Sequence, residues 1–395
     1  MGFTLRNLRF RRTCHQHNVL AGIFVAVLAG IGGCDLTSWV DNLGTDGNVG
    51  LNPSLFPERR IQGEPNDAFD NALDVIFDSA GRAHLAGTIT HSDDVDVYLL
   101  GSLEPGDRII VDVGTPGSLL DAVIVIFDAE GRLTFENDDR NYALRQYDPF
   151  LNQVVRHSSP KYYLAITAAP LGSGYASRGT YDVLITVTSG NDVPAPAGQV
   201  VVLDFDGGSV TIPDYGSYKL QPFDAADIDP VYAGQTALLR QLIAETVREN
   251  YEGLNLDVRV IPDDPLPAGE YSSIFFGASS SDAFGVAEAI DPYNMDRDDD
   301  AVVFTNLFTK RLFGRVLTIE ELGTAIGNVA SHEMGHLLGL NHVADIYDLM
   351  DTTGGAGTLL IDQEFLRDSP LDSSVFPFGI QDAWLWLMET LGPAS

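Results

Sequence analysis

The stretch "SHEMGHLLGLNH", residues 331–342, contains three of the eight histidines in this 395-residue chain. Apolar residues fill many of its other positions, which is typical of a helix that lies in a protein core. His332 and His336 are four residues apart, so a helix would project both side chains from one face, one turn apart. Two imidazoles at this separation are suitably placed to bind a single metal ion.

Gly339 and His342 would complete such a site. Gly339 stands three residues after His336, where glycine can adopt the left-handed conformation that ends a helix and turns the chain back. That turn would allow His342 to approach the metal as a third ligand. Three neutral imidazoles leave one position of a tetrahedral zinc ion open for water, which is the arrangement of catalytic zinc sites.

Glu333 directly follows the first of these histidines and is the predicted general base. Zinc lowers the pKa of its bound water, the carboxylate takes the proton, and the resulting hydroxide attacks a carbonyl group. The alternative is that the histidines only decorate a buried helix. Five fixed letters in this order occur by chance in roughly one chain in 10⁵, which disfavours that alternative.

The motif resembles the signature H-E-x-x-H-x-x-G-x-x-H of the metzincin clan of zinc endopeptidases. The matching positions are His332, Glu333, His336, Gly339 and His342. The resemblance implies an α+β catalytic domain and a methionine turn beneath the zinc. Met350 follows His342 by eight residues, which is similar to the spacing of the matrixin branch. The resemblance also implies that substrate pairs with an edge strand, which by chain order is expected at residues 284–290.

The chain departs from the better-known metzincins in three respects. Thr352 occupies the position where astacin-like and serralysin-like members carry a tyrosine that stabilises the transition state. Val343 follows the third histidine and matches none of the better-known branches. No propeptide cysteine is available, so latency through a zinc-bound thiolate is not expected.

The chain divides into two predicted domains. Short alternating runs separated by turn signals predict an antiparallel β-sandwich over residues 61–189. A Pro/Ala/Gly-rich linker follows at 190–199, and strands and helices over 200–395 form the catalytic domain. The predicted fold class is therefore an all-β sandwich followed by an α+β zincin-like domain, with helices at residues 237–254, from Ile319 onward, and at 380–392.

The N-terminal segment predicts export. Residues 1–33 combine four arginines with an apolar run and no acidic residue, as in a signal peptide. The run ends in "IGGC", which resembles the lipobox of bacterial lipoproteins and implies that Cys34 carries a lipid anchor. The alternative is a plain signal peptide with a stray cysteine. Residues 34–60, rich in Gly, Asn, Asp and Pro, are predicted to be a flexible tether to an envelope membrane, either inner or outer.

The predicted sandwich contains "GEPNDAFDNA" and "SDDVDVYLL" and resembles the pre-peptidase C-terminal domain found beside secreted bacterial proteases. The resemblance implies a calcium site, while the alternative is that its acidic residues make only turns. The implied ligands are Glu64, Asn66, Asp67, Asp93, Asp94 and Asp96.

A second acidic loop, "IDPYNMDRDDDA", spans residues 290–301. Its alternating oxygen ligands suit calcium, but it lacks the glycine and terminal glutamate of an EF-hand loop. A solvated acidic turn is an equally good interpretation. The candidate ligands are Asp291, Asn294, Asp296 and Asp298.

The formal net charge of −33 excludes a nucleic-acid partner, since nucleic-acid binding depends on basic surfaces. We therefore expect a monomeric zinc endopeptidase, tethered to the bacterial cell envelope, that acts on protein or peptide substrates. The alternative is a calcium-dependent adhesion or scaffold lipoprotein whose protease-like domain is silent. The presence of Glu333 argues against that alternative, because a domain kept only for binding needs no general base.

Overall fold

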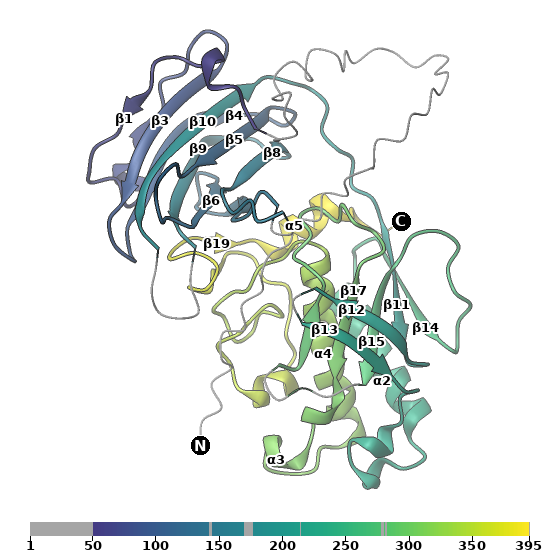
Figure 1. Cartoon of the computed structure of the whole chain (residues 1–395). Helices are drawn as coiled ribbons and strands as arrows, with labels where there is room; N and C mark the ends of the chain where they lie inside the picture. The colour runs from purple at the N-terminus through teal and green to yellow at the C-terminus, as the bar shows by residue number, and fades with distance from the viewer. Residues whose placement is uncertain are drawn as a thin grey trace, which may run out of the picture.

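The computed structural model describes residues 50–141, 144–169, 177–213, 215–277, 280 and 283–394. The predicted signal peptide, Cys34 and residues 35–49 of the predicted tether lie outside the described residues. The described chain is rich in β-structure, with three five-stranded sheets and two small two-stranded ones. Two of the large sheets lie in the first half of the chain, and the third lies in the second half together with the longest helices (Figure 1).

The first half is a β-sandwich in which two sheets pack face to face. One sheet has the order β1 (Arg60–Ile61), β3 (Arg82–Ile89), β10 (Gly179–Thr188), β5 (Arg108–Gly114), β8 (Phe150–Val154). The other has the order β2 (Leu73–Asp74), β4 (Val95–Leu103), β9 (Ser159–Ala168), β6 (Ala122–Phe127), β7 (Leu133–Asn137). Neighbouring strands are antiparallel except at the pairs β1–β3 and β2–β4.

Part of the predicted tether belongs to the sandwich. Residues 50–60 include the 3₁₀ helix η1 (Pro53–Leu55), whose first turn is capped by Asn52. The Leu51 backbone N–H donates to Asp112, and Arg59 forms an ion pair with Asp182. The tether prediction is therefore wrong for residues 50–60, because contacts with distant strands hold a segment whose composition alone indicates a flexible chain.

The second half is built on a mixed sheet. Its order is β14 (Leu256–Ile261), β11 (Gln199–Asp204), β15 (Ser272–Gly277), β17 (Asp300–Phe304), β16 (Gly285–Ala287). The first four strands are parallel, whereas β16 is antiparallel to β17 and lies at the edge. The edge strand expected at 284–290 is therefore present, although it is shorter than predicted.

The two faces of this sheet have different covers. Helices α2 (Thr236–Asn250) and α4 (Ile319–Leu337) pack against each other and against one face. The hairpin formed by β12 (Gly208–Ile212) and β13 (Gly216–Leu220) packs against the other. Strand β17 shows the alternation, since Val303 belongs to the main core and Val302 to the smaller cluster under the hairpin. The hairpin was not among the predicted elements.

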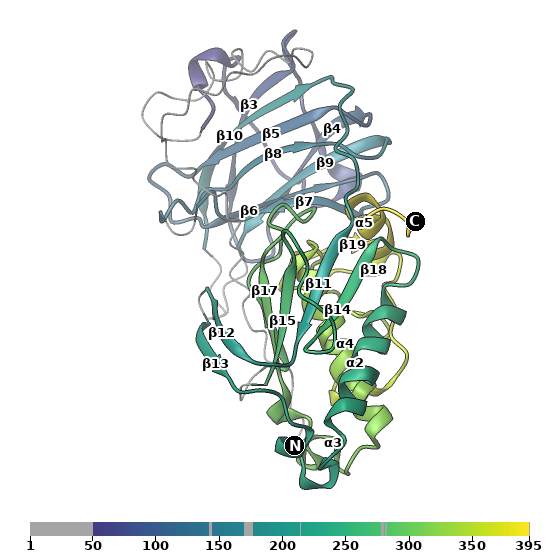
Figure 2. The same ribbon diagram turned by 90° about the vertical axis from the view of Figure 1, so that its right-hand side faces the viewer.

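The remaining elements are short. They are η2 (Phe69–Asn71), η3 (Ala225–Asp227), η4 (Pro230–Tyr232), η5 (Thr305–Leu307), α3 (Lys310–Phe313), η6 (Ala356–Leu360), β18 (Ser369–Pro370), β19 (Ile380–Gln381) and α5 (Ala383–Thr390). Within the described ranges, no helix has the combination of length and apolar character that crossing a membrane requires. Figure 2 shows that β19 and α5 lie beside the sandwich, next to β7.

Candidate metal centre

Helix α4 places the first two histidines and the glutamate of the motif. It begins with a capping box in which Thr318 and Glu321 each accept a hydrogen bond from the other's backbone N–H, at 3.2 and 2.9 Å. A capping box fixes the first turn and so the rotation of all later residues about the helix axis. His336 is fully buried at the other end of this helix, one turn beyond His332.

Gly339 ends the helix as predicted. Its φ is +93°, its backbone N–H donates to His336 O at 2.9 Å, and the Leu340 N–H donates to Gly335 O at 2.8 Å. These two bonds are the Schellman arrangement. A Cβ atom at Gly339 would lie 2.8 Å from both Asp291 O and Pro292 Cα. Both the backbone conformation and the available space therefore require glycine at this position.

The turn brings the three histidines together. The Nε2 atom of His336 lies 3.1 Å from the Nε2 atom of His332 and 3.1 Å from that of His342. One ligand atom from each residue lies within 4.8 Å of the others. The spacing of the motif thus places three imidazoles around one point, as the sequence predicts.

Backbone carbonyl groups orient two of the rings. His332 Nδ1 lies 2.7 Å from Leu349 O, and His336 Nδ1 lies 2.8 Å from Leu340 O. Because a carbonyl only accepts, each Nδ1 carries the proton and each Nε2 presents its lone pair to the shared point. Burial lowers the pKa of His332, although its bond to Leu349 opposes the shift, so the neutral form is favoured. Three neutral imidazole nitrogens suit a zinc ion.

Glu333 is buried with one oxygen atom unpaired. Its side chain is 3 % exposed, and among the described residues its Oε2 atom has no hydrogen-bond partner. This burial raises the pKa of its carboxyl group well above the usual range. A buried carboxyl oxygen without a partner costs about 1–3 kcal/mol, so a protein retains one at a cost to its stability. Such a cost is typical of a carboxyl group that is kept for a function rather than for stability.

Gly285 makes room for this carboxyl group. It is the first residue of the edge strand β16, and a Cβ atom there would lie 2.4 Å from Glu333 Oε1. Any other residue would therefore displace the glutamate or the strand. Sequence reasoning missed this role, because the contact joins residues far apart in the chain and a glycine in a short strand carries no signal of its own.

The methionine of the predicted turn packs against helix α4 at Gly335. Met350 is fully buried, and its Sδ atom lies 2.6 Å from the position of a Cβ atom at Gly335, between the two helical histidines. Val343 pairs with this turn, since its N–H donates to Met350 O at 3.0 Å. Thr352 is engaged elsewhere, because its Oγ1 donates to Asp372 Oδ2 at 3.2 Å.

Asp348 organises the same turn and was not predicted. One of its carboxyl oxygens accepts from the Met350 N–H at 2.9 Å, and the other accepts from Ser369 Oγ at 2.6 Å. The residue is fully buried, and burial raises its pKa to about 6. The carbonyl of Leu349, which lies between Asp348 and Met350 in the chain, orients His332, so Asp348 indirectly supports the candidate metal centre.

A second group of potential ligands lies in the sandwich. Oxygen atoms of Glu64, Asp67 and Asp94 lie within 4.8 Å of one another. Asp94 is buried and the other two are exposed. Asn66 is also buried, and neither amide atom makes a hydrogen bond among the described residues. These four residues are among the six predicted calcium ligands.

The other two predicted ligands are placed differently. Asp93 is exposed, and its Oδ1 accepts from Ser92 Oγ at 3.2 Å. Asp96 is buried and accepts a hydrogen bond from Tyr181 at 2.5 Å, and Tyr181 in turn contacts the hydroxyl of Tyr98. Burial, with the nearby Glu64 charge, raises the pKa of Asp96 to about 7. The structure therefore brings neither residue into the three-carboxylate group.

The acidic loop at 290–301 does not gather its carboxylates. Among the described residues, only the histidine group and the group around Asp94 bring three such side chains together, so Asp291, Asp296 and Asp298 form no third group. Asp291 is instead buried, accepts from the Asp296 N–H at 2.7 Å, and has a pKa raised by burial to about 8. Asn294 lies buried with a φ of +54°. Neither amide atom of Asn294 makes a hydrogen bond among the described residues, so calcium binding by this loop stays a prediction.

Comparisons with known proteins give no family. No family model matches the chain, and no curated protein matches it. Among solved structures, it is similar to the pre-peptidase C-terminal domain of collagenase from Bacillus anthracis, with 15% identity over 32% of this chain and 100% of that chain and a TM-score of 0.22.

Two further similarities are of the same kind. A zinc-dependent peptidase from Methanocorpusculum labreanum has 12% identity over 48% of this chain and 100% of its own, with a TM-score of 0.25. PliG from Aeromonas hydrophila, a periplasmic inhibitor of g-type lysozyme, has 16% identity over 33% of this chain and 100% of its own, with a TM-score of 0.24. TM-scores this low establish neither a shared fold nor a shared function.

Proposed function

We propose that the protein is a zinc-dependent endopeptidase whose second half is a metzincin-like catalytic domain. The observation that carries this proposal is the convergence of three imidazole Nε2 atoms beside a buried carboxyl group. If the histidines had no common function, there would be no reason for backbone carbonyls to orient two of their rings. Nor would there be a reason for glycine at the close contacts of residues 285, 335 and 339. These features support a reactive metal centre more strongly than a structural one.

Each residue has a distinct role in the proposed reaction. His332, His336 and His342 would hold the metal through their Nε2 atoms. When bound in such a site, zinc supplies Lewis acidity, which lowers the pKa of water and polarises a carbonyl group. A cation held by the histidines would oppose the effect of burial and favour the ionised form of Glu333. The carboxylate would then take a proton from the attacking water at Oε2 and deliver it to the leaving amine. Gly285 keeps the space that this carboxyl group occupies.

The edge strand supports a peptide substrate. Strand β16 pairs with β17 on one side and forms the end of the sheet in the described chain. Its first residue contacts Glu333, so the strand lies directly beside the proposed base. An extended peptide can add to such an edge through backbone hydrogen bonds that do not depend on its side chains. A substrate of this form extends on both sides of the scissile bond, which is the definition of an endopeptidase substrate.

The decisive test compares the full-length chain with its Glu333→Gln variant. Both should bind about one zinc ion per chain, measured by elemental analysis, because the metal ligands are intact in each. Cleavage of a denatured protein substrate should fall by about 10²- to 10⁴-fold in the variant, since general base catalysis is worth that much. A wild-type chain that binds zinc but cleaves no faster than the variant would contradict the proposal. That outcome would favour the alternative function of an adhesion or scaffold protein.

The sandwich is proposed to bind calcium at the group of Glu64, Asp67 and Asp94. The buried amide of Asn66, which makes no hydrogen bond among the described residues, supports an additional oxygen ligand there. Calcium prefers sets of carboxylate and carbonyl oxygens of this kind. Its role would be to hold together the two loops that contribute these ligands.

Membrane attachment is proposed from the sequence of residues 1–34 alone. A diacylated Cys34 would hold the chain at a bacterial membrane without a spanning helix. The Cys34→Ala variant of the full-length protein should be found in the soluble fraction of the cell, whereas the wild type should be found in the membrane fraction. Unchanged fractionation would contradict the lipid anchor.

A further inference from the structure

His342 is the one proposed ligand that no helix holds, and a distant glutamine fixes the residue before it. Gln381 is the last residue of β19 and is 1 % exposed. Its Oε1 accepts from the Asn341 N–H at 2.8 Å, and its Nε2 donates to Asn341 O at 2.9 Å. The side chain thus clamps both backbone groups of Asn341, in the way that a neighbouring strand would. The peptide bond that leads into His342 is thereby fixed.

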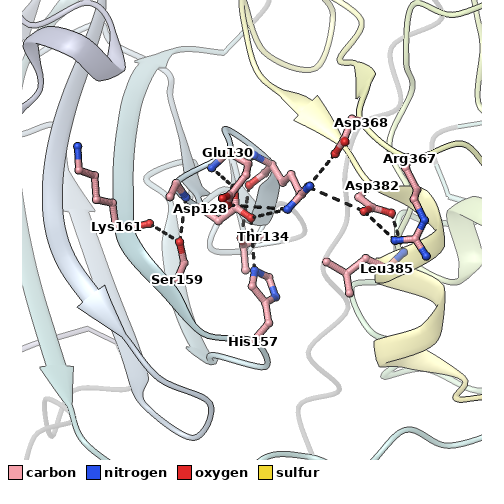
Figure 3. Close-up of polar contacts among 12 residues, drawn as sticks. Asp128, Glu130, Thr134, His157, Ser159, Lys161, Arg367, Asp368, Asp382 and Leu385 are labelled. Atoms are coloured by element: carbon pink, nitrogen blue, oxygen red, sulfur yellow. Dashed lines mark hydrogen bonds and ion pairs between the residues drawn. The ribbon is translucent and has the colours of Figure 1, made fainter.

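The strand that carries Gln381 is in turn held by the sandwich. The Ile380 N–H donates to Gly131 O at 3.0 Å, and Ile380 forms a β-bridge with Arg132 in the turn between β6 and β7. The Arg132 guanidinium donates to Asp368 at 2.7 Å and lies 3.8 Å from Asp382. Figure 3 shows Asp128 on the sandwich side of this boundary and Asp368 and Asp382 on the other side. The turn between β6 and β7 is thus joined to residues 368–382 by a backbone hydrogen bond at Ile380 and by ion pairs at Asp368 and Asp382.

Aromatic side chains pack tightly at the same boundary between the sandwich and the second half of the chain. The ring of Phe127, at the end of β6, lies 5.5 Å from that of Phe376 and 5.7 Å from that of Phe378. Gly379 has a φ of +102°, and a Cβ atom there would lie 2.4 Å from Phe127 Cε1. The sandwich therefore sets the position of the chain two residues before Gln381.

A second contact from the sandwich reaches the end of α4. Arg156 lies over the ring of Tyr293 at 3.7 Å, and Tyr293 stacks on Trp386 at 4.4 Å. Trp386 Nε1 donates to Leu338 O at 2.9 Å. Trp386 thus binds one end of the turn from Leu338 to Asn341, and Gln381 binds the other end. Trp386 contacts the sandwich through the ring of Tyr293, and the residue before Gln381 contacts it directly.

We propose that Gln381 is a positioning residue for the ligand His342 and that the sandwich holds Gln381 in place. The inference rests on the proposed role of His342 in binding zinc. Interactions behind the ligands commonly change metal affinity by about 10- to 100-fold, because they set the orientation in which a ligand is held. The sandwich is thus part of the scaffold of the metal centre and not only a spacer or a binding module.

The experiment uses Co²⁺ as a spectroscopic probe in the full-length chain. Gln381→Leu should weaken Co²⁺ binding by about 10- to 100-fold in competition with a chromophoric chelator. It should also reduce the intensity of the visible d–d bands, because a displaced His342 distorts the tetrahedral site. Gln381→Asn, which shortens the side chain and should lose at least one of the two hydrogen bonds, replaces it if the leucine variant does not fold.

Gln199→Leu is the matched control. Gln199 is equally buried at 1 % exposure, and its Nε2 donates to Ser272 Oγ at 2.8 Å and to Arg297 O at 3.0 Å. Its replacement should lower stability to a similar degree but leave the affinity for Co²⁺ and the spectrum unchanged. If the variants at Gln381 and Gln199 bind Co²⁺ alike and give the same spectrum, the positioning role is overturned.

Gly379→Ala tests the contribution of the sandwich, because the added methyl group would collide with Phe127. Like Gln381→Leu, it should weaken Co²⁺ binding. Gly269→Ala is its control, since Gly269 has a φ of +111° with nothing near the added atom. Normal binding by Gly379→Ala would overturn the part assigned to the sandwich. A wild-type chain that binds no Co²⁺ would refute the proposed function itself, which is a different outcome from a difference among variants.

Discussion

The two halves of the chain each bring together three potential cation ligands, and they do so in opposite ways. In the second half, the ligands lie within residues 332–342, so the period of one helix and one glycine turn places them. In the sandwich, Glu64 and Asp67 meet Asp94 across a gap in the sequence, where the Val97 N–H donates to Asn66 O and joins the two segments. One group is local in sequence, and the other is a product of tertiary structure.

The two groups also differ in the charge of their ligands. Three neutral imidazoles do not repel one another, and backbone carbonyls orient two of them before any ion arrives. Three carboxylates within 4.8 Å of one another do repel, and a cation offsets that repulsion. The first group is therefore arranged before any metal binds, whereas a bound cation would stabilise the second.

The largest expected effect comes from the turn that makes the histidine group local. Gly339→Ala should lower the free energy of unfolding by about 2–4 kcal/mol, from an unfavourable φ and from the clash with Asp291 and Pro292. Zinc content should fall as well, because His342 can no longer reach the other ligands. Urea denaturation monitored by tryptophan fluorescence measures the stability, and elemental analysis measures the zinc.

Gly314→Ala is the control for this prediction. Gly314 also has a positive φ, +74°, but an added Cβ atom would meet nothing within 4 Å. It should cost about 1 kcal/mol, the value for backbone strain alone, with full zinc content. Equal losses at the two glycines would show that the turn at Gly339 is not specially constrained.

The intermediate effect concerns the carboxylate group. Calcium at about 100 times its dissociation constant should stabilise the sandwich by about 2.7 kcal/mol, which calorimetry would record as a higher unfolding temperature. Asp94→Asn should abolish the shift, because it removes the buried charge of the group. Asp93→Asn should keep it, since Asp93 is the exposed neighbour outside the group. A shift that survives in Asp94→Asn would place the calcium elsewhere.

The smallest effect concerns the boundary between the halves. His157, in the sandwich, lies 2.9 Å from Glu389 of α5 and 3.6 Å from Asp128. Burial disfavours the charged imidazole, but hydrogen bonds and attraction from these carboxylates outweigh it and raise the pKa of His157 to about 9. Its stabilisation is thus fully present below pH 6.5, the ordinary value, and is lost as the pH rises through 9.

We expect this loss to be about 1 kcal/mol, because the side chain keeps some contact with solvent. Unfolding temperatures measured between pH 6.5 and 10 should therefore fall more for the wild type than for His157→Gln. Parallel curves for the two proteins would show that the histidine does not couple the halves through its charge.

Much of the fold could be predicted from local patterns. The alternating runs of residues 61–189 include strands β3, β4, β5, β6, β9 and β10, and helices α2, α4 and α5 lie within or overlap the predicted helical ranges. Strands β7 and β8 and the hairpin β12–β13 were missed, because they are short and have no sustained alternation. Residues 50–60 were assigned to the tether for the same reason, since only contacts with β5 and β10 order them.

The sequence alone determined the three histidines, the glutamate and the glycine turn, since helical periodicity and a left-handed glycine act over a few residues. Only the tertiary structure decided which distant residues complete the site. Gly285 beside Glu333, Ser369 hydrogen-bonded to Asp348 of the methionine turn, and Gln381 hydrogen-bonded to the residue before His342 are separated in the chain from the groups that they support. Close packing makes each contact specific, but no short-range pattern encodes it, because the partners meet only when the sheet, the helices and the sandwich have assembled.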